Sequence, residues 1–155
     1  QHQLPVIVVR LFNTVGPRQV GHYGMVVPRF VEQAINNSPI TVFGSGKQSR
    51  CFCNVEDTIK ALLGLISDEN CIGEVFNIGS SQEISIEDLA RMIKHITNSK
   101  SEITFTPYED AYSSGFEDML RRVPDTAKIN RFIGWEASIG LEETIRRVWR
   151  YIEQE

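Results

Sequence analysis

Two hydrophobic periodicities run along the chain, one typical of buried strands and one of helices with a single apolar face. A short, unbroken apolar run at residues 6–9 predicts a parallel strand that is covered on both faces. Few residues precede this run, and no similar run with a crossover helix lies close to it, so we expect the strand to be orphaned from its neighbours. The chain is therefore predicted to begin inside a larger sheet.

Apolar residues spaced three and four apart predict helices at residues 25–37, 55–66, 85–96, 125–133 and 141–152. Ser85 and Asp88 have the spacing of a capping box at the start of the third helix. Short apolar runs predict strands at residues 40–43, 48–53, 74–78 and 102–105. Residues 44–47 join two of these strands by a connection of hairpin length. The pattern as a whole predicts an α/β fold.

One long segment, residues 107–124, has no regular periodicity. Long irregular segments inside compact domains are usually binding elements or disordered. We therefore expect a functional loop there.

The composition fits one compact domain. The chain has 155 residues, 41% of them hydrophobic and 23% charged, which is enough for one core. Its formal net charge of −4 argues against nucleic-acid binding, because proteins that follow a phosphate backbone usually carry a basic face. No apolar run reaches the roughly 18 to 20 residues that span a bilayer, and the first residues do not resemble a secretion signal. We expect a cytoplasmic protein with no membrane partner.

The sequence offers little for metal binding or hydrolysis. Its three cysteines, Cys51, Cys53 and Cys71, lack the paired spacing of a zinc site, so we expect buried free thiols and no metal. Its three histidines have no serine, cysteine or carboxylate at the spacing of a catalytic triad. Asp57 lies in the first turn of a predicted helix, where interaction with the helix dipole accounts for it. No catalytic residue is assigned.

The glycine pair Gly44 and Gly46 suggests a phosphate-binding loop but lacks the features of one. A dinucleotide fingerprint leads into a helix, whereas the residues after Gly46 are predicted to be extended. A Walker motif has Ser or Thr directly after its lysine, whereas Lys47 is followed by Gln48. A hairpin turn is the better interpretation.

Anion binding is the chemistry that the sequence favours. A guanidinium can bind a diphosphate through two parallel charged hydrogen bonds. The candidates are Arg10, Arg18, Arg50, Arg121 and Arg122. Arg50 is the strongest, since it shares a predicted strand with Phe52, where an unpaired charge is costly. Asn13 follows the first strand, where its amide can either donate to a phosphate or cap the loop.

Several segments stand out by their joint order and spacing: Arg10-Leu-Phe-Asn13-Thr-Val-Gly16-Pro17-Arg18, Pro39-Ile-Thr-Val-Phe-Gly-Ser-Gly46-Lys-Gln-Ser-Arg50, Val55-Glu-Asp57, Phe76-Asn-Ile-Gly79 and Arg122-Val-Pro-Asp125. Together they resemble the C-terminal half of the extended short-chain dehydrogenase/reductases, the NAD-dependent epimerase/dehydratase family. The resemblance covers essentially the whole chain. Within the family the chain is most similar to UDP-glucose 4-epimerases and UDP-glucuronate decarboxylases.

The resemblance implies roles for particular residues. The positions that match substrate-binding positions of the family are Asn13, Thr41, Gln48, Arg50, Phe116 and Arg122. Asn13, Arg50 and Arg122 fall where the family contacts the nucleotide diphosphate. Thr41 and Gln48 border the nucleotide, and Phe116 stands where an aromatic residue often supports the uracil or ribose. Phe12 and Thr14 match positions near the nicotinamide of NAD.

The resemblance also implies an architecture. Residues 1–18 correspond to the last strand and ligand loop of an NAD-binding Rossmann domain, and residues 19–155 to the small substrate-binding domain. The family's glycine-rich turn and catalytic Tyr-x-x-x-Lys pair lie upstream of the matched region, and no tyrosine of this chain has a lysine four residues later. In complete members NAD oxidises a sugar hydroxyl, with the tyrosinate as base. The chain alone is therefore expected to be catalytically inactive.

These implications give one functional hypothesis and two rivals. The first is the nucleotide-sugar-binding part of an NAD-dependent epimerase with a UDP-sugar as partner, or of a UDP-glucuronate decarboxylase or sugar dehydratase. The second is a non-catalytic nucleotide-sugar-binding module, and the third a purely structural role. Complete family members commonly form homodimers, largely through helices outside the matched half. Cys51 and Cys53 stand where many relatives carry Asp or other residues, which leaves the subfamily open.

Overall fold

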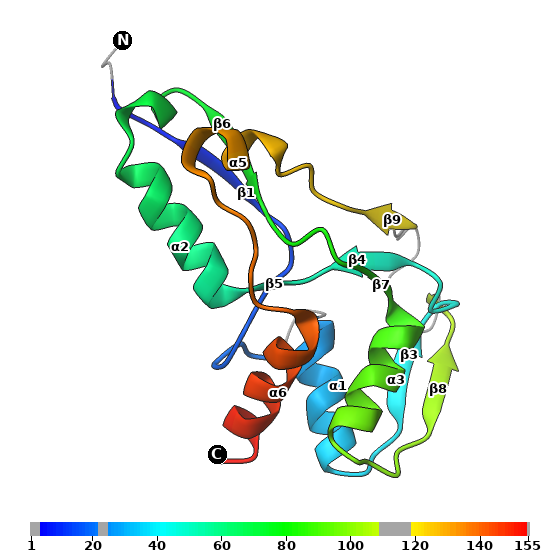
Figure 1. The fold of residues 1–155 in the computed structure, drawn as a ribbon. Helices are drawn as coiled ribbons and strands as arrows, with labels where there is room; N and C mark the ends of the chain where they lie inside the picture. The colour runs from blue at the N-terminus through cyan, green and yellow to red at the C-terminus, as the bar shows by residue number, and fades with distance from the viewer. Residues whose placement is uncertain (1–3, 22–24, 109–118, 155) are drawn as a thin grey trace. The chain divides into compact units, whose positions relative to one another are not determined.

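The computed structural model describes residues 4–21, 25–108 and 119–154, and Figure 1 shows the course of the chain. The chain divides into two compact units, each built from segments that are far apart in the sequence. Unit 1 comprises residues 1–15, 51–83 and 123–141, and unit 2 comprises residues 16–50, 84–122 and 142–155. The chain thus passes repeatedly between the units. The single domain boundary expected at residue 18 stays a prediction about the complete protein.

Parallel strand pairs and helices make up unit 1. Its elements are β1 (Val8–Leu11) paired with β6 (Val75–Ile78), β2 (Thr14–Val15) paired with β5 (Cys53–Asn54), α2 (Val55–Ile66), the 3-10 helix η1 (Glu69–Cys71) and α5 (Ala127–Ile133). In the longer pair, Val9 lies opposite Phe76 and Leu11 opposite Ile78. The predicted α/β class is confirmed.

The core of unit 1 lies on one face of the β1–β6 pair. Its fully buried side chains come from β6, α2 and α5: Phe76, Ile78, Ala61, Leu65 and Ile129. Phe132 of α5 meets Phe76 edge to face, with ring centroids 5.2 Å apart. Burial of this size is the main source of the unit's stability.

The first strand differs from its prediction in two respects. It is not orphaned, because β6 pairs with it along one edge, where Val8 N donates to Glu74 O at 3.0 Å. It is also covered on one face only: Val6 and Val8 are half exposed, whereas Ile7 and Val9 pack against the core. The apolar run marked a strand, but nothing local in the sequence identified a partner that lies so far along the chain.

Unit 2 combines a parallel strand pair, a three-stranded sheet and helices. Its helices and strand pair are α1 (Val26–Ile35), α3 (Ile86–Ile96), α6 (Leu141–Ile152) and β3 (Ile40–Phe43) with β8 (Ile103–Thr106). The sheet has the order β7 (Glu83–Ser85), β4 (Ser49–Cys51), β9 (Arg121–Arg122). Asp88 N donates to Ser85 Oγ at 3.0 Å at the start of α3, which confirms the predicted capping box.

The hairpin expected around residues 44–47 is wrong. β3 pairs with β8, and β4 with β7 and β9, so the strands on either side of the turn do not pair with each other. The turn still depends on glycine, because Gly44 and Gly46 have φ angles of 69° and 71°. The length of the connection suggested a hairpin, whereas the actual pairing is made with strands remote in sequence.

The helices predicted from apolar spacing are confirmed, but α2 does not bury all of its apolar residues. Ala61 and Leu65 face the core, while Ile59, Leu63 and Ile66 remain exposed. In the part of the chain that the structure describes, no helix has the length and apolar character needed to cross a membrane.

Candidate functional site

Arg50 and Arg122 are brought together by strand pairing. Arg50 lies in β4 and Arg122 in β9, and the two are register partners in a parallel ladder. Partners in a parallel ladder lie about 4.8 Å apart in the backbone and project side chains from the same face. Two arginine side chains therefore leave the same face of the sheet from neighbouring positions, an arrangement that suits a ligand with two negative groups.

The backbone around Arg50 holds its side chain in place. Arg50 Nη1 donates to the carbonyl oxygens of Ser49 and Met119, both at 2.7 Å. Ser49 N donates to Leu120 O at 2.8 Å, which ties β4 to the start of β9. The side chain is partly buried, so its orientation is set by the sheet before any ligand arrives.

Gln48 and Thr41 have structural contacts in the same unit. The side chain of Gln48 is 6% exposed, and its Nε2 donates to Phe43 O at 3.0 Å and to the Tyr108 hydroxyl at 2.8 Å. Thr41 N donates to Gln33 Oε1 at 3.1 Å. The Gln48 contacts hold the end of β3 across the glycine turn, and the Thr41 contact joins β3 to α1. The nucleotide contacts expected of both residues stay predictions.

Asn13 occupies a strained position in unit 1. Its φ is 40°, its Nδ2 donates to Cys51 O at 2.7 Å, and its carbonyl accepts from Cys53 N at 3.1 Å. Both bonds join the end of β1 to the segment that leads into β5. Of the two roles considered for Asn13, capping of the loop is therefore observed, and the phosphate contact stays a prediction.

The two residues expected near NAD also lie in unit 1. Phe12 N donates to Ile78 O at 2.9 Å, and the hydroxyls of Thr14 and Thr58 are 3.4 Å apart. Both residues thus stand just past the carboxyl end of β1, where open parallel sheets place ligands. Phe116, the expected support for the base, lies outside the described residues.

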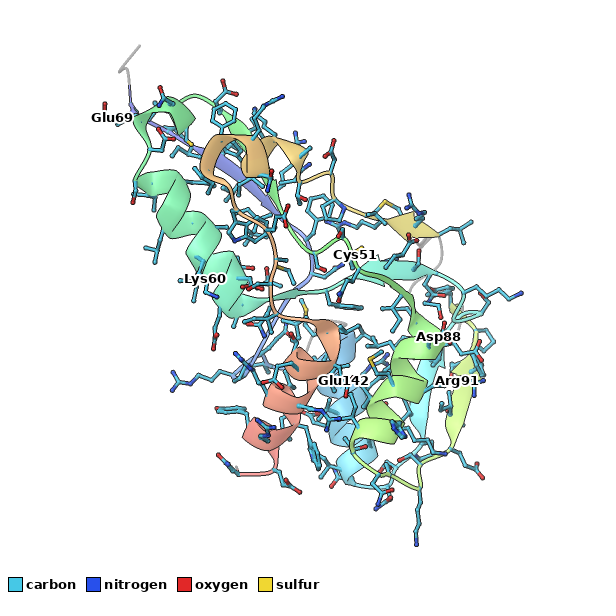
Figure 2. All side chains as sticks on the ribbon, in the orientation of Figure 1. Cys51, Lys60, Glu69, Asp88, Arg91 and Glu142 are labelled. Carbon is cyan, nitrogen blue, oxygen red and sulfur yellow. The ribbon has the colours of Figure 1, made fainter. Side chains whose placement is uncertain are left out.

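Asp57 has a structural role beyond the helix-dipole interaction expected from the sequence. Its fully buried carboxylate accepts hydrogen bonds from Ile139 N at 2.7 Å, from Ser138 N at 2.8 Å and from Ser138 Oγ at 2.9 Å. Lys60, labelled in Figure 2, lies 3.3 Å from the same group. Trp135 Nε1 donates to the Asp57 carbonyl at 3.0 Å.

The electrostatics of Asp57 follow from these contacts. Burial by itself would raise the pKa of the carboxyl, but the hydrogen bonds from Ile139, Ser138 and Lys60 outweigh burial and hold the pKa below its ordinary value. Asp57 therefore stays ionised and fastens residues 138–139 to the start of α2. In the sequence, only the segment Val55-Glu-Asp57 drew attention to this position. The residues that bind the carboxylate, Ser138 and Ile139, lie far along the chain, so the sequence did not indicate the contact.

A polar cavity of about 570 Å³ lies at the carboxyl end of β6 in unit 1. Its lining includes Ser81, Asp125, Asn130 and Glu136. Gly79, at its edge, has no room for a side chain, because a Cβ there would lie 2.8 Å from Pro124 Cγ and 2.9 Å from Phe12 Cβ. The cavity is built from hydroxyl, amide and carboxylate groups, which suit a polyhydroxylated ligand.

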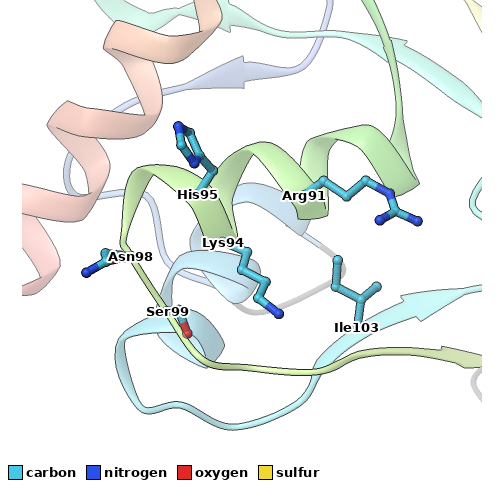
Figure 3. Close-up of a pocket in the computed structure, with 6 residues that line it drawn as sticks. All are labelled: Arg91, Lys94, His95, Asn98, Ser99 and Ile103. Atoms are coloured by element: carbon cyan, nitrogen blue, oxygen red, sulfur yellow. The ribbon is translucent and has the colours of Figure 1, made fainter.

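A second cavity of about 430 Å³ lies between α3 and β8 in unit 2. Its lining includes Arg91, Lys94, His95 and Asn98, whose side chains extend in different directions in Figure 3. Arg91 is already paired with Glu87 at 2.5 Å. The polar groups of this cavity do not converge on one point, so the cavity does not define a charged-ligand site.

The cysteines and the possible metal ligands among the described residues do not form another candidate site. Cys51, Cys53 and Cys71 are free and buried, as the sequence predicted. Burial raises the pKa of the Cys53 and Cys71 thiols. Across residues 4–21, 25–108 and 119–154, no three His, Cys, Asp or Glu side chains are placed to hold a metal ion.

The parallel strand pairs and their helices define an α/β protein, and comparison with known proteins shows its family. The family described as GDP-mannose 4,6 dehydratase matches residues 1–148. A UDP-N-acetyl-alpha-D-glucosaminuronate decarboxylase of Bacillus cytotoxicus is 41% identical over 150 residues, which are 92% of this chain and 46% of that protein. UDP-glucuronic acid decarboxylase 1 of Xenopus tropicalis is 37% identical over 155 residues, covering 100% of this chain and 35% of that protein.

Comparison with solved structures supports the same family. The UDP-glucuronic acid 4-epimerase from Bacillus cereus, in complex with UDP-glucuronic acid and NAD, superimposes with a TM-score of 0.86 at 26% identity. The match covers 97% of this chain and 46% of that one. The chain belongs to the extended short-chain dehydrogenase/reductases, whose epimerases, decarboxylases and dehydratases use NAD. It spans between a third and a half of the length of these curated relatives.

Proposed function

We propose that the chain is the nucleotide-sugar-binding part of an NAD-dependent sugar-nucleotide enzyme and that its ligand is a UDP-sugar. The observation that carries this proposal is the pairing of Arg50 with Arg122 on neighbouring strands. A diphosphate offers two charged groups at a spacing that neighbouring guanidiniums can each bind. The UDP-sugar complexes among the relatives support the choice of ligand.

In this account, Arg50 and Arg122 bind the diphosphate, and the rest of the nucleotide serves to position the sugar. Binding of a remote group can supply the orientation that a reaction needs. Thr41 of β3 and Gln48, which directly precedes β4, border the nucleotide, while Asn13 holds the loop after β1. Phe116 remains the predicted support for the uracil or ribose.

For the reaction of the complete enzyme, decarboxylation of a UDP-sugar acid is the first candidate. The relatives at 41% and 37% identity are decarboxylases of that kind. Epimerisation, expected from the sequence, is the second candidate, supported by the likeness to the 4-epimerase structure. Both candidates need the same nucleotide-binding groups, so they differ in parts of the site that hold the sugar.

The residues of this chain fit NAD only in part. Thr14 offers a hydroxyl at the carboxyl end of the sheet, within 3.4 Å of the Thr58 hydroxyl, and Phe12 lies beside it. The sequence has no Tyr-x-x-x-Lys pair, and the residues that the structure describes form no glycine-rich strand–turn–helix. NAD, when bound, would supply hydride transfer to and from the sugar. We infer that Phe12 and Thr14 border its nicotinamide and that the chain alone is inactive.

A titration of the chain with UDP, GDP and dTDP, followed by NMR, tests this proposal. UDP is expected to bind saturably and to shift resonances in β4 and β9, with weaker binding of the other nucleotides. UDP-glucuronic acid should shift the same resonances and additional ones. Equal binding of all three nucleotides, or shifts confined to other elements, would contradict the proposal.

A further inference from the structure

Strand β9 has little apolar burial to hold it on its sheet. Its two residues, Arg121 and Arg122, are exposed, and the residues before it, Met119 and Leu120, are 56% and 78% exposed. Among the described strands, β9 stands at one end of the order β7, β4, β9, with β4 as its neighbour. Because burial contributes little here, the attachment of β9 depends on polar contacts with β4.

Arg50 of β4 supplies a side-chain contact of this kind. Its Nη1 donates to Ser49 O and to Met119 O, both at 2.7 Å. The first bond holds the guanidinium against its own strand, and the second crosses to the segment that enters β9. A charged donor makes such a bond roughly twice as strong as a neutral one. Arg50 is thus one of the groups that hold this segment.

The backbone joins the same two segments. Ser49 N donates to Leu120 O at 2.8 Å, and the register pairs Ser49 with Arg121 and Arg50 with Arg122. The contact between Arg50 and Met119 adds a bond just before this short ladder begins. The position of the Arg122 backbone is therefore tied to the side chain of Arg50.

We propose that Arg50 is a positioning residue for Arg122 as well as a phosphate-binding residue. Its guanidinium fastens the start of β9 to β4, and β9 then presents Arg122 on the same face of the sheet. One arginine thereby preorganises the other, so that a ligand need not order β9 when it binds. The phosphate contact rests on the proposed function, whereas the fastening of β9 does not.

The alternative is that Arg50 affects β9 through its charge alone. In that case, Arg50→Gln and Arg122→Gln would change β9 alike, because each removes one of the two neighbouring charges. The proposed bond makes the two variants differ, because it is Arg50 Nη1 that reaches Met119 O. Arg122→Gln is therefore the matched control, since it removes a charge and keeps this bond.

Hydrogen exchange of the ligand-free chain tests the proposal at the Ser49 amide, which is protected by its bond to Leu120 O. Arg50→Gln should speed this exchange about tenfold or more, as expected for the loss of a charged hydrogen bond. It should also raise the mobility of the Arg122 amide in NMR relaxation. Arg122→Gln should leave the exchange of the Ser49 amide unchanged.

The rest of unit 2 should not be affected by Arg50→Gln. The Gly44 amide, which donates to Thr106 O at 2.8 Å, should keep its exchange rate, and the urea midpoint should change little. Unchanged exchange at Ser49, or an equal change in Arg122→Gln, would overturn the proposal. A large loss of global stability in Arg50→Gln would overturn it as well, because Arg50 would then have a general structural role.

Nucleotide binding separates this proposal from the proposed function. UDP bound by both arginines should slow exchange at the Ser49 amide of the unaltered chain, since a ligand held by Arg122 also holds β9. A failure of UDP to bind would count against the proposed function, and the exchange of the ligand-free variants would still decide the role of Arg50. UDP that binds without slowing this exchange would show that it does not engage β9, and would overturn the positioning role.

Discussion

Arg50 of β4 and Arg122 of β9 are register partners in a parallel ladder, although the two residues are far apart in the sequence. Two arginines at opposed positions concentrate positive charge at one place on the sheet, which an anionic ligand complements. This is the feature that links the local fold of unit 2 to a binding function.

The buried carboxylate of Asp57 should stabilise the fold in a pH-dependent way. Replacing it in Asp57→Asn leaves the N–H groups of Ser138 and Ile139 with a weaker acceptor, at a cost of about 3 kcal/mol at pH 7. The folded-state pKa is lowered, so this stability is present above the ordinary Asp pKa of about 3.9 and is lost as the pH falls through the folded value. Urea unfolding at several pH values measures the difference.

The matched control for Asp57 is Glu143→Gln. Arg147 holds the pKa of Glu143 below its ordinary value through a hydrogen bond, but the carboxylate is on the surface. Its removal should change the urea midpoint far less than Asp57→Asn does. Equal effects of the two variants would show that Asp57 is no more than another surface charge.

The tight packing at Gly79 gives a second prediction. Gly79→Ala would place a Cβ 2.8 Å from Pro124 Cγ and 2.9 Å from Phe12 Cβ, and should destabilise the protein by about 1–3 kcal/mol. In Gly140→Ala the new Cβ would meet nothing within 4 Å, so its effect should be small. Thermal unfolding of the two variants provides the comparison, and a neutral Gly79→Ala would refute the described packing of β6.

Burial should make the cysteines slow to react. Burial raises the pKa of Cys53 and Cys71, and Cys51 is equally buried, so little thiolate is exposed near neutral pH. An aromatic disulfide reagent should modify the native protein slowly and titrate three thiols in denaturant. Rapid modification of any thiol before unfolding would contradict this burial.

The helices and the capping box could be predicted from the sequence because their signals are local. Apolar residues recur every three or four positions in α3, and Ser85 precedes Asp88 by the capping distance. Arg50 could be selected as an anion-binding candidate in the same way, because a charged side chain in a strand with Phe52 is costly unless another group pairs with it. These inferences depend on neighbours within one element.

Strand pairing could not be predicted, because it depends on segments remote in sequence. The turn at Gly44 and Gly46 has the length of a hairpin, yet β3 pairs with β8. The partner of β1 and the contacts of Asp57 with residues 138–139 are equally remote. For the same reason, the sequence did not show that Arg50 and Arg122 are neighbours, and the structure was needed to show it. Before that, only the family resemblance had assigned both residues to the diphosphate.

The central claim is that Arg50 and Arg122 bind one diphosphate, and a double-mutant cycle on UDP affinity tests it most directly. Arg50→Gln and Arg122→Gln should each weaken binding about tenfold, while Arg91→Gln on α3 serves as the control. The double variant should lose less than the two single losses combined, with a coupling of about 0.5–3 kcal/mol. Strictly additive losses, or single variants that bind UDP as the unaltered chain does, would contradict the claim.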